Sequence, residues 1–283
     1  MIAASAALST LLVACRSSAI PNQVLTKPAA VSTPTPVARA AGPWIYHASA
    51  QRQQFFLDQR ATITIRLDGA TRTDTVSTHA EVSFTAAQVT NGVSGTVNVF
   101  LVQSGGGAAA TPPGVAVPFP VRGEYSARGP QLDFTTPHES TPCASTTLSV
   151  AQSLRDLWFR PPDTLRVGTA WQDSASYVVC RDGIPLRATA HRSFQITGTT
   201  ERDGRPLLTV ARTSRTAIDG GGAQFGETVG VAGTASGQLV YDLEPSTGEV
   251  VSAMGNATLD LTVRSRLRTQ VVRQVADIRV GRS

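Results

Sequence analysis

Three arginines near the C-terminus, Arg264, Arg266 and Arg268, recur at every second residue, which is the spacing of a β-strand. Side chains two residues apart in a strand point to the same face and lie ~7 Å from one another. Guanidinium groups so placed can hold a phosphate or a carboxylate-rich ligand, such as a lipid headgroup. The alternative, which we consider the commoner origin of this pattern, is an ordinary solvated face of a sheet.

Histidines provide a second kind of candidate chemistry. The chain has His47, His79, His138 and His191, each isolated in sequence. A Ser-His-Asp set can assemble from residues far apart in sequence, so a periplasmic hydrolase with a scattered site is an alternative function. His79 and His191 fall on the polar faces of predicted strands, which favours a structural role. We therefore predict no catalytic residue.

The common catalytic and cofactor motifs are absent from the sequence. A phosphate-binding loop requires Gly-Lys-Ser/Thr, and the single lysine, Lys27, precedes a proline. Neither GxGxxG nor GxSxG occurs, so the run from Gly220 to Gly222 is interpreted as a turn. After His138-Glu139, Pro142 stands where a zinc-binding HExxH motif needs its second histidine. No metal site and no cofactor are predicted.

The charge of the chain does not indicate a nucleic-acid partner. The net charge is +5 over 283 residues, and the basic residues are spread along the chain. No block of five to eight lysines or arginines occurs, and no aromatic residues are interleaved with basic ones.

The N-terminal segment has the features of an export signal. Residues 2–14 are apolar and uncharged and precede Cys15. A run of about 13 residues is too short to span a ~30 Å hydrocarbon core, but it has the length of a signal-peptide core. The segment Leu12-Val13-Ala14-Cys15 resembles the lipobox of bacterial lipoproteins. That resemblance implies that residues 1–14 are removed as a signal peptide and that Cys15 carries a diacylglycerol anchor.

The lipoprotein resemblance also implies a destination. A lipoprotein signal opens with Lys or Arg, whereas Ile2 follows Met1 here, so we expect the true start to lie upstream. Arg16 differs from the Asp that favours retention in the inner membrane. The resemblance thus implies an exported, lipid-anchored protein of the cell envelope, on the outer membrane facing the periplasm. Residues 15–43 are rich in Ala, Ser, Thr and Pro, a composition that predicts a disordered tether.

Two further cysteines remain after lipidation, Cys143 and Cys180. An even count in an oxidising compartment predicts a disulfide between them. It would stabilise the fold by about 4 kcal/mol, since it closes a loop of about 37 residues. Two free buried thiols are the alternative.

The rest of the chain predicts a mainly all-β domain at 44–283, which could divide into halves at 44–137 and 138–283. Alternation of apolar and polar residues begins at Ala61, and Asp-Gly turn signals recur. One short helix is predicted near 147–159, before Pro161. Short connections favour an antiparallel meander that curls into a barrel or half-barrel. The predicted strands span 61–68, 72–84, 94–102, 114–126, 130–136, 170–180, 186–197, 206–218, 224–242, 248–263 and 265–280.

A second resemblance lies in the C-terminal half. The stretch from Leu165 through Gly168 and Trp171 to Ser174 is similar to a proline-then-VGxxW segment in a domain of unknown function found in bacterial envelope lipoproteins. A Gly-rich strand that leads into Tyr241-Asp242 and Thr247-Gly248 extends the similarity to about 100 residues. The resemblance implies no catalytic residue. From the residues themselves, Gly168 is expected in a turn, and Trp171 in the core at the start of a strand.

These observations together predict a non-enzymatic binding or carrier module tethered to a membrane by its N-terminal lipid. A curled meander could hold a lipid or another apolar ligand in its interior. The alternatives are the hydrolase and a purely structural envelope protein. Protein partners are not predicted.

Overall fold

The computed structural model describes residues 42–45, 51–89, 92–105, 117–125, 131–135, 159–181, 184–224 and 226–282. These residues all belong to one compact unit, Ala41–Ser283. Most of them lie in β-strands, and none of those described forms a helix. The strands are β1 (Trp44–Ile45), β2 (Gln51–Leu67), β3 (Ala70–Val89), β4 (Gly92–Gly105), β5 (Val117–Tyr125), β6 (Gln131–Thr135), β7 (Thr164–Leu165), β8 (Ala170–Arg181), β9 (Ile184–Arg202), β10 (Arg205–Gln224), β11 (Glu227–Leu243), β12 (Val250–Arg264) and β13 (Thr269–Arg282).

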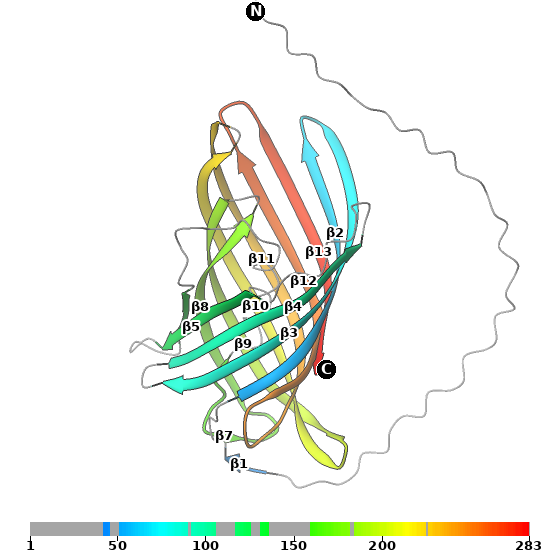
Figure 1. The fold of residues 1–283 in the computed structure, drawn as a ribbon, viewed down its shortest axis with the longest axis vertical. Helices are drawn as coiled ribbons and strands as arrows, with labels where there is room; N and C mark the ends of the chain where they lie inside the picture. The colour runs from blue at the N-terminus through cyan, green and yellow to red at the C-terminus, as the bar shows by residue number, and fades with distance from the viewer. Residues whose placement is uncertain are drawn as a thin grey trace, which may run out of the picture. The chain divides into compact units, whose positions relative to one another are not determined.

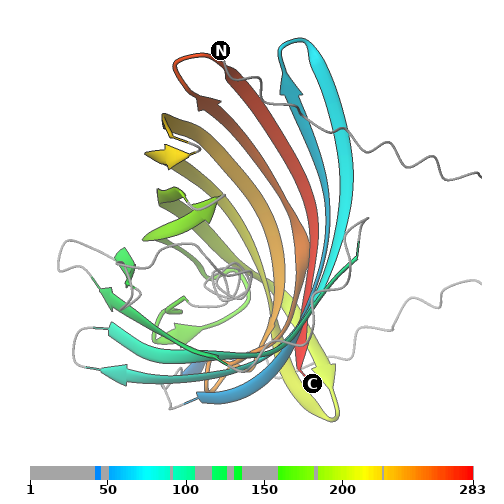
Figure 2. The same ribbon diagram turned by 45° about the horizontal axis from the view of Figure 1, so that its top comes forward.

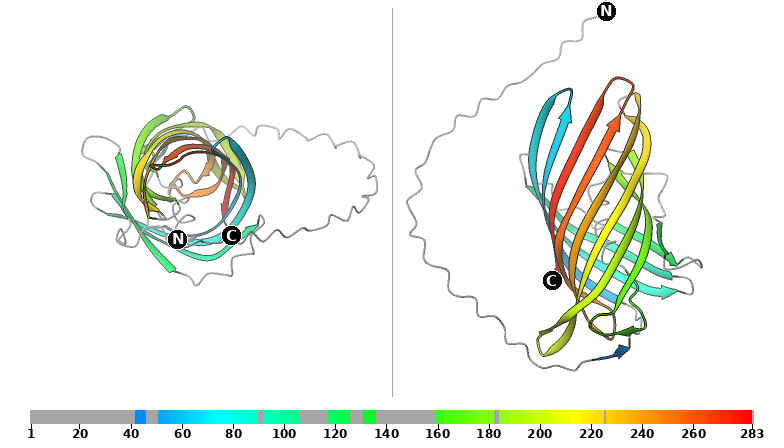
Figure 3. Two further views of the ribbon diagram at one scale, coloured as in Figure 1. Left: turned by 90° about the horizontal axis from the view of Figure 1, so that it is seen from above. Right: turned by 180° about the vertical axis from the view of Figure 1, so that it is seen from behind.

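Eleven of the described strands pair into one curled sheet (Figures 1 and 2). Their order is β10-β11-β12-β13-β2-β3-β4-β5-β6-β8-β9, and β9 pairs with β10, so the strands follow one another around a common axis (Figure 3). Neighbours are antiparallel except β6 and β8, which share three parallel residue pairs. The strands β1 and β7 form a separate two-stranded sheet. The predicted antiparallel meander that curls into a barrel or half-barrel is confirmed.

Where side chains are described, alternation along the strands gives the sheet a mainly apolar inner face and a mainly polar outer face. In β9, Leu186, Ala188 and Phe194 are buried, whereas the residues that alternate with these inner positions, such as Arg187 and His191, are mostly exposed. The same alternation runs through β11, where Leu239 and Tyr241 are buried. Successive side chains of a strand point to opposite faces. A strand can therefore place its apolar side chains on one face while its backbone pairs with both neighbouring strands. The core therefore lies on the inner face of the curl.

Two of the predicted Asp-Gly turns have the backbone geometry that this dipeptide favours. Asp68 and Gly69 join β2 to β3 with φ of 50° and 82°, and Asp203 and Gly204 join β9 to β10 with φ of 51° and 74°. Positive φ at both central residues matches the right-handed twist of hairpin strands. These turns set the register in which residues of neighbouring strands share a face.

Two sequence-based predictions are wrong in this region. Gly220 and Gly221 do not form a turn, because they lie in β10 and pair with Val231 and Gly230 of β11. A Cβ atom on Gly221 would lie only 2.8 Å from the carbonyl oxygen of Val229. Glycine at this position thus permits close approach of two backbones, and the turn falls later, at Gly226 with φ of 80°.

The second correction concerns the predicted strand at 265–280. The structure places this strand, β13, at Thr269–Arg282, and residues 265–268 form the hairpin loop that joins it to β12. Ser265 closes the loop, since its backbone N–H donates to the carbonyl of Arg268 at 2.9 Å. The alternating pattern of the sequence continues through the loop, so the pattern alone does not reveal where β12 ends.

Several predictions fall on residues outside the described ones. The predicted helix at 147–159 is one of these, except for its last residue, Phe159, which is not helical. Cys15 and Cys143 also lie outside them, as does the tether at 15–43 except for Gly42 and Pro43. Cys180 belongs to β8, where its backbone pairs with Pro185. The disulfide, the lipid anchor and the signal peptide thus stay predictions.

The loop between β11 and β12 is organised around one carboxylate. The backbone N–H groups of Ser246 and Thr247 donate to Oε2 of Glu244 at 3.1 Å and 2.7 Å, and both hydroxyls also donate to this carboxylate. Gly248 completes the turn with φ of 67°. Burial by itself would raise the pKa of Glu244, but the hydrogen bonds from Thr247 and Ser246 outweigh it and hold the pKa below its ordinary value of 4.5.

We expect Glu244→Gln to lower the free energy of unfolding by about 1 kcal/mol at pH 7, since Glu244 is partly exposed and its hydrogen bonds are partly screened. A carboxylate with a lowered pKa in the folded state stabilises that state above the unfolded pKa. This stabilisation is lost as the pH falls through the folded pKa. The difference between the two proteins should therefore shrink as the pH falls below 4.5 through the lowered pKa of Glu244, as measured by urea denaturation across pH. Glu81→Gln, on the exposed outer face of β3, is the control, and an equal effect there would contradict this assignment.

Candidate functional site

The inner face of the curled sheet carries two apolar clusters. The first, which we call the Tyr241 cluster, also contains Phe55, Leu57, Phe194 and Leu208, and Trp171 packs against it. The rings of Trp171 and Phe194 stack with centroids 4.9 Å apart. The expectation that Trp171 packs at the core where a strand begins is confirmed.

The second cluster, which we call the Leu186 cluster, lies toward the loops that join β2 to β3 and β12 to β13. Its buried members are Ile184, Leu186, Ala188, Ile218, Val229, Val231, Leu261 and Val272. Around them pack inner-face residues that are only partly buried, namely Ile63, Ile65, Tyr177, Val179, Ala235, Leu259 and Val263. Apolar side chains therefore remain accessible on the inner face at this end of the sheet.

A cavity of about 390 Å³ opens where the Leu186 cluster meets the end of the sheet. Its apolar lining comes from Leu67 of β2, Val229 of β11, Val263 of β12 and Leu267 of the β12–β13 loop. In the paired strands Val263 lies opposite Gln270, which in turn lies opposite Leu67, so these inner-face residues are neighbours across three strands. The polar part of the lining is Glu227, Ser265, Arg268 and Gln270. Pockets of this size with an apolar wall and a few polar groups are typical of small-molecule sites.

The inner face also contains a buried ion pair. The Nε and Nη2 atoms of Arg192 donate to Oδ1 and Oδ2 of Asp173, each at 2.6 Å, and the two side chains are 2% and 7% exposed. The guanidinium group of Arg192 lies 5.5 Å from the ring centroid of Phe194. The pair joins β8 to β9, since Asp173 and Arg192 face one another across these strands. A bidentate geometry of this kind offsets much of the cost of removing both charges from water.

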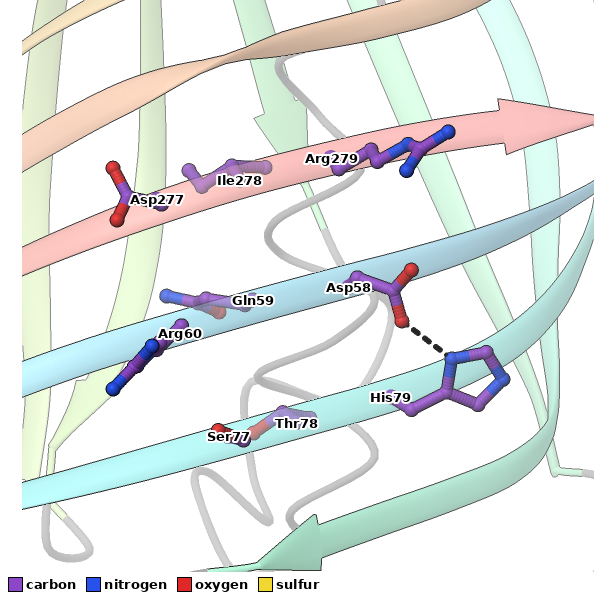
Figure 4. Close-up of a pocket in the computed structure, with 9 residues that line it drawn as sticks. All are labelled: Asp58, Gln59, Arg60, Ser77, Thr78, His79, Asp277, Ile278 and Arg279. Atoms are coloured by element: carbon purple, nitrogen blue, oxygen red, sulfur yellow. Dashed lines mark hydrogen bonds and ion pairs between the residues drawn. The ribbon is translucent and has the colours of Figure 1, made fainter. Parts of the chain in front are cut away.

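A second pocket, of about 460 Å³, lies on the outer face of β13, β2 and β3 (Figure 4). Within it, Nδ1 of His79 lies 2.6 Å from Oδ1 of Asp58. Both side chains are substantially exposed, at 38% and 48%. Ser77 lines the same pocket, but the imidazole of His79 points away from it in Figure 4. Among the described residues, no hydroxyl donates a hydrogen bond to His79.

His191 lines a third hollow, of about 650 Å³, on the outer face of β9 to β12. Its neighbours there are Ser193, Thr213, Arg215, Ser236 and other polar residues. His79 and His191 thus both lie on the polar face, as predicted, and they do not approach one another. His47 and His138 lie outside the described residues.

The three arginines considered as a possible anion site do not share one strand. Arg264 is the last residue of β12, whereas Arg266 and Arg268 belong to the loop that follows it. All three are exposed. Their common location is therefore the tip of a hairpin, beside the cavity that Arg268 helps to line.

Sequence reasoning did not find the inner cavity or the Asp173–Arg192 pair. Both depend on the register between strands, which sequence periodicity does not give. One signal was present: Asp173 and Arg192 each occupy an apolar position in the alternation of β8 and β9. A charged residue at such a position requires a buried partner, because an isolated buried charge is costly.

No protein-family model matches the chain, and the search of curated proteins found no match. A crystal structure of a DUF1329 family protein from Desulfovibrio piger ATCC 29098 is similar at 11% identity, over 82% of this chain and 86% of that one. The TM-score is 0.16, and we base no argument on a likeness at this level.

None of the elements formed by the described residues is a helix long and apolar enough to cross a membrane. No group of three or more His, Cys, Asp or Glu residues is placed to hold a metal ion in this part of the chain.

We expect Arg192→Met to lower the free energy of unfolding by about 3–5 kcal/mol, because it leaves the carboxylate of Asp173 buried without its cation. The double variant Arg192→Met/Asp173→Leu should recover most of this loss, since it removes both charges. Chemical denaturation of the three proteins checks the expectation. Arg273→Met is the matched control, because Arg273 and Asp260 lie 3.9 Å apart and are both exposed. This substitution should lower the free energy of unfolding by less than about 1 kcal/mol. A double variant as unstable as the single one would contradict the proposed pairing.

Proposed function

We propose that this protein is a membrane-anchored lipoprotein of the cell envelope whose β domain binds an apolar ligand on the inner face of its curled sheet. The observation that carries the proposal is the cavity beside the Leu186 cluster, with its wall of Leu67, Val229, Val263 and Leu267. Partly buried apolar residues continue from this cavity along the inner face. A ligand that covered them would gain about 25 cal/mol for each Å² of apolar surface removed from water.

The lining of the cavity favours one class of ligand. An acyl chain needs only an apolar wall, and each methylene that it buries contributes ~0.8 kcal/mol. The polar groups Glu227, Ser265, Arg268 and Gln270 lie on the same cavity and could meet the polar end of an amphiphile. A lipid or fatty acid therefore fits the lining better than a sugar or a nucleotide does.

The location of the protein belongs to the same proposal. The lipobox at Leu12 to Cys15 supports export, lipidation and a tether at residues 15–43. Arg16 supports the outer membrane, facing the periplasm. A lipid-binding domain held near a membrane surface would have its ligand within reach.

The alternative functions have weaker support. The Asp58–His79 pair favours a hydrolase only in part, because no described nucleophile contacts His79. A purely structural role offers no explanation for accessible apolar side chains on an inner face, since a folded domain ordinarily covers such residues.

Val263→Glu should weaken the binding of an apolar dye or of a C16 fatty acid at least about tenfold, or ~1.4 kcal/mol, because it places a charge on the apolar wall. Binding is measured by fluorescence titration of the mature chain, residues 15–283, carrying Cys15→Ala, which keeps it free of both the lipid and the apolar residues 2–14. Val275→Glu is the control, since Val275 lies on the outer face at 44% exposure. Native mass spectrometry of both variants checks that they are folded. The carrier proposal fails if the parent chain binds neither probe, or if both substitutions act equally.

Cys15→Ala should abolish membrane retention and leave unprocessed precursor, because the thiol that receives the diacylglycerol is missing. Membrane fractionation and intact-mass measurement of the protein expressed in a bacterium check this. Cys180→Ala, which leaves the lipobox unchanged, should remain with the membrane. If the Cys15→Ala protein still fractionates with the membrane, the lipobox is not the anchor.

A further inference from the structure

The loop between β12 and β13, residues 265–268, ends in an exposed apolar side chain set among arginines. Leu267 is 72% exposed, the highest fraction among the large apolar side chains of the described residues. Arg266 and Arg268 flank it in sequence, and Arg264 lies at the base of the loop. All three arginines are exposed. We call residues 264–268 the tip.

The tip is held in one conformation by Ser265. Its Oγ accepts hydrogen bonds from the backbone N–H groups of Leu267 and Arg268, at 3.3 Å and 3.2 Å. Its own N–H donates to the carbonyl of Arg268. Leu267 therefore projects from an ordered turn, at the end of two strands that run side by side along β12 and β13 (Figure 1).

The tip is also a local excess of positive charge. Among the described residues, none of the three guanidinium groups forms an ion pair. The nearest hairpin, β2–β3, is balanced, with Arg66 and Arg72 against Asp68 and Asp74, and Glu227 lies on the far side of the cavity. The three arginines of the tip thus face one further carboxylate. The opposite hairpin, β9–β10, is balanced, with two arginines and two acidic residues at positions 201–205.

The tip forms part of the mouth of the inner cavity. Leu267 and Arg268 project from the tip and line the cavity at the same time. A surface that contacted the tip would therefore lie against the opening through which an apolar ligand enters. An apolar residue among cations is the arrangement that suits the boundary of an anionic bilayer, where headgroups attract the cations and the acyl region receives the apolar side chain.

We propose that the tip docks the domain on a bilayer that contains anionic phospholipid, with Leu267 inserted at the headgroup boundary. This places the mouth of the cavity against the membrane, and it rests on the proposed function only in assigning the cavity as the ligand site. The partner is the bilayer surface, recognised by charge and by one apolar contact. Docking of this kind is reversible, because a single side chain and three charges bind far more weakly than a lipid anchor does.

The test uses the mature chain, residues 15–283, with Cys15→Ala, so that neither a lipid anchor nor the apolar residues 2–14 contribute to binding. Sedimentation with vesicles of phosphatidylglycerol and phosphatidylcholine should bring down the protein, and vesicles of phosphatidylcholine alone should not. Arg264→Gln/Arg266→Gln should weaken binding to the anionic vesicles roughly 30-fold, at about fivefold for each charge. Raising the salt concentration should weaken the binding of the parent chain in the same direction.

Matched controls separate the tip from general surface effects. Arg202→Gln/Arg205→Gln removes two exposed arginines from the opposite hairpin and should leave vesicle binding unchanged. Leu267→Asn should reduce vesicle binding, whereas Met254→Asn, at a residue that is 59% exposed on the outer face, should not. Equal losses for the two arginine pairs would overturn the proposal, as would equal binding to anionic and neutral vesicles.

Ligand binding measured on the same proteins distinguishes this proposal from the preceding one. Arg264 and Arg266 do not line the cavity, so their substitution should leave dye and fatty-acid binding intact. A parent chain that binds the probes but no vesicles would refute docking and leave the carrier role standing. A chain that binds anionic vesicles through the tip but no probe would support docking and refute the carrier role.

Discussion

A sheet with one apolar face must cover that face, and this constraint governs the rest of the structure. The strands β8 to β13 and β2 to β3 are long, and each contributes one mainly apolar row to the inner face. No described helix lies against these rows, and the sheet covers them by curling until its own inner side chains meet. The apolar side chains of the inner face are covered best along the middle of each strand. They are covered least at the ends of the strands, because no residue of another strand reaches across there. The cavity beside the Leu186 cluster lies at such an end.

The curl also explains why glycines and a buried ion pair occur on the inner face. Gly220 and Gly233 permit neighbouring backbones to approach more closely than a Cβ would allow, since a Cβ on Gly220 would lie 2.7 Å from the carbonyl oxygen of Pro185 and one on Gly233 would overlap the carbonyl of Asp260. Arg192 and Asp173 satisfy one another across β8 and β9, beside the short joint of β8 with β6. A buried pair of this type adds little net stability, but it tolerates few alternative registers, because a shift by one residue would bury one charge alone. The pair therefore fixes how the last strands of the ring align.

The predictive value of the sequence differed between elements. The boundaries of β8 and of β4 to β6 were predicted to within three residues, whereas β3 ends at Val89, five residues beyond its predicted end. The first residues of β2, from Gln51 to Arg60, were missed, since polar and apolar residues there do not alternate as plainly. The β12–β13 loop was placed one residue long instead of four, because the alternation of arginines continues through it. That error moved Arg266 and Arg268 from a loop onto a strand face, and so changed what the arginines could contact.

By itself, the sequence determined the fold class, the direction of most strands and the absence of the common catalytic motifs, because these depend on local periodicity and on short spacings. It also supplied the resemblance of Leu12 to Cys15 to a lipobox, which depends on a linear segment alone. Only the tertiary structure decided which residues meet: Asp173 with Arg192, Asp58 with His79, and Leu267 with the mouth of the inner cavity. The physical reason is register. A shift of one residue between two strands preserves every periodic pattern in the sequence, yet it exchanges the inner and outer faces and with them every site.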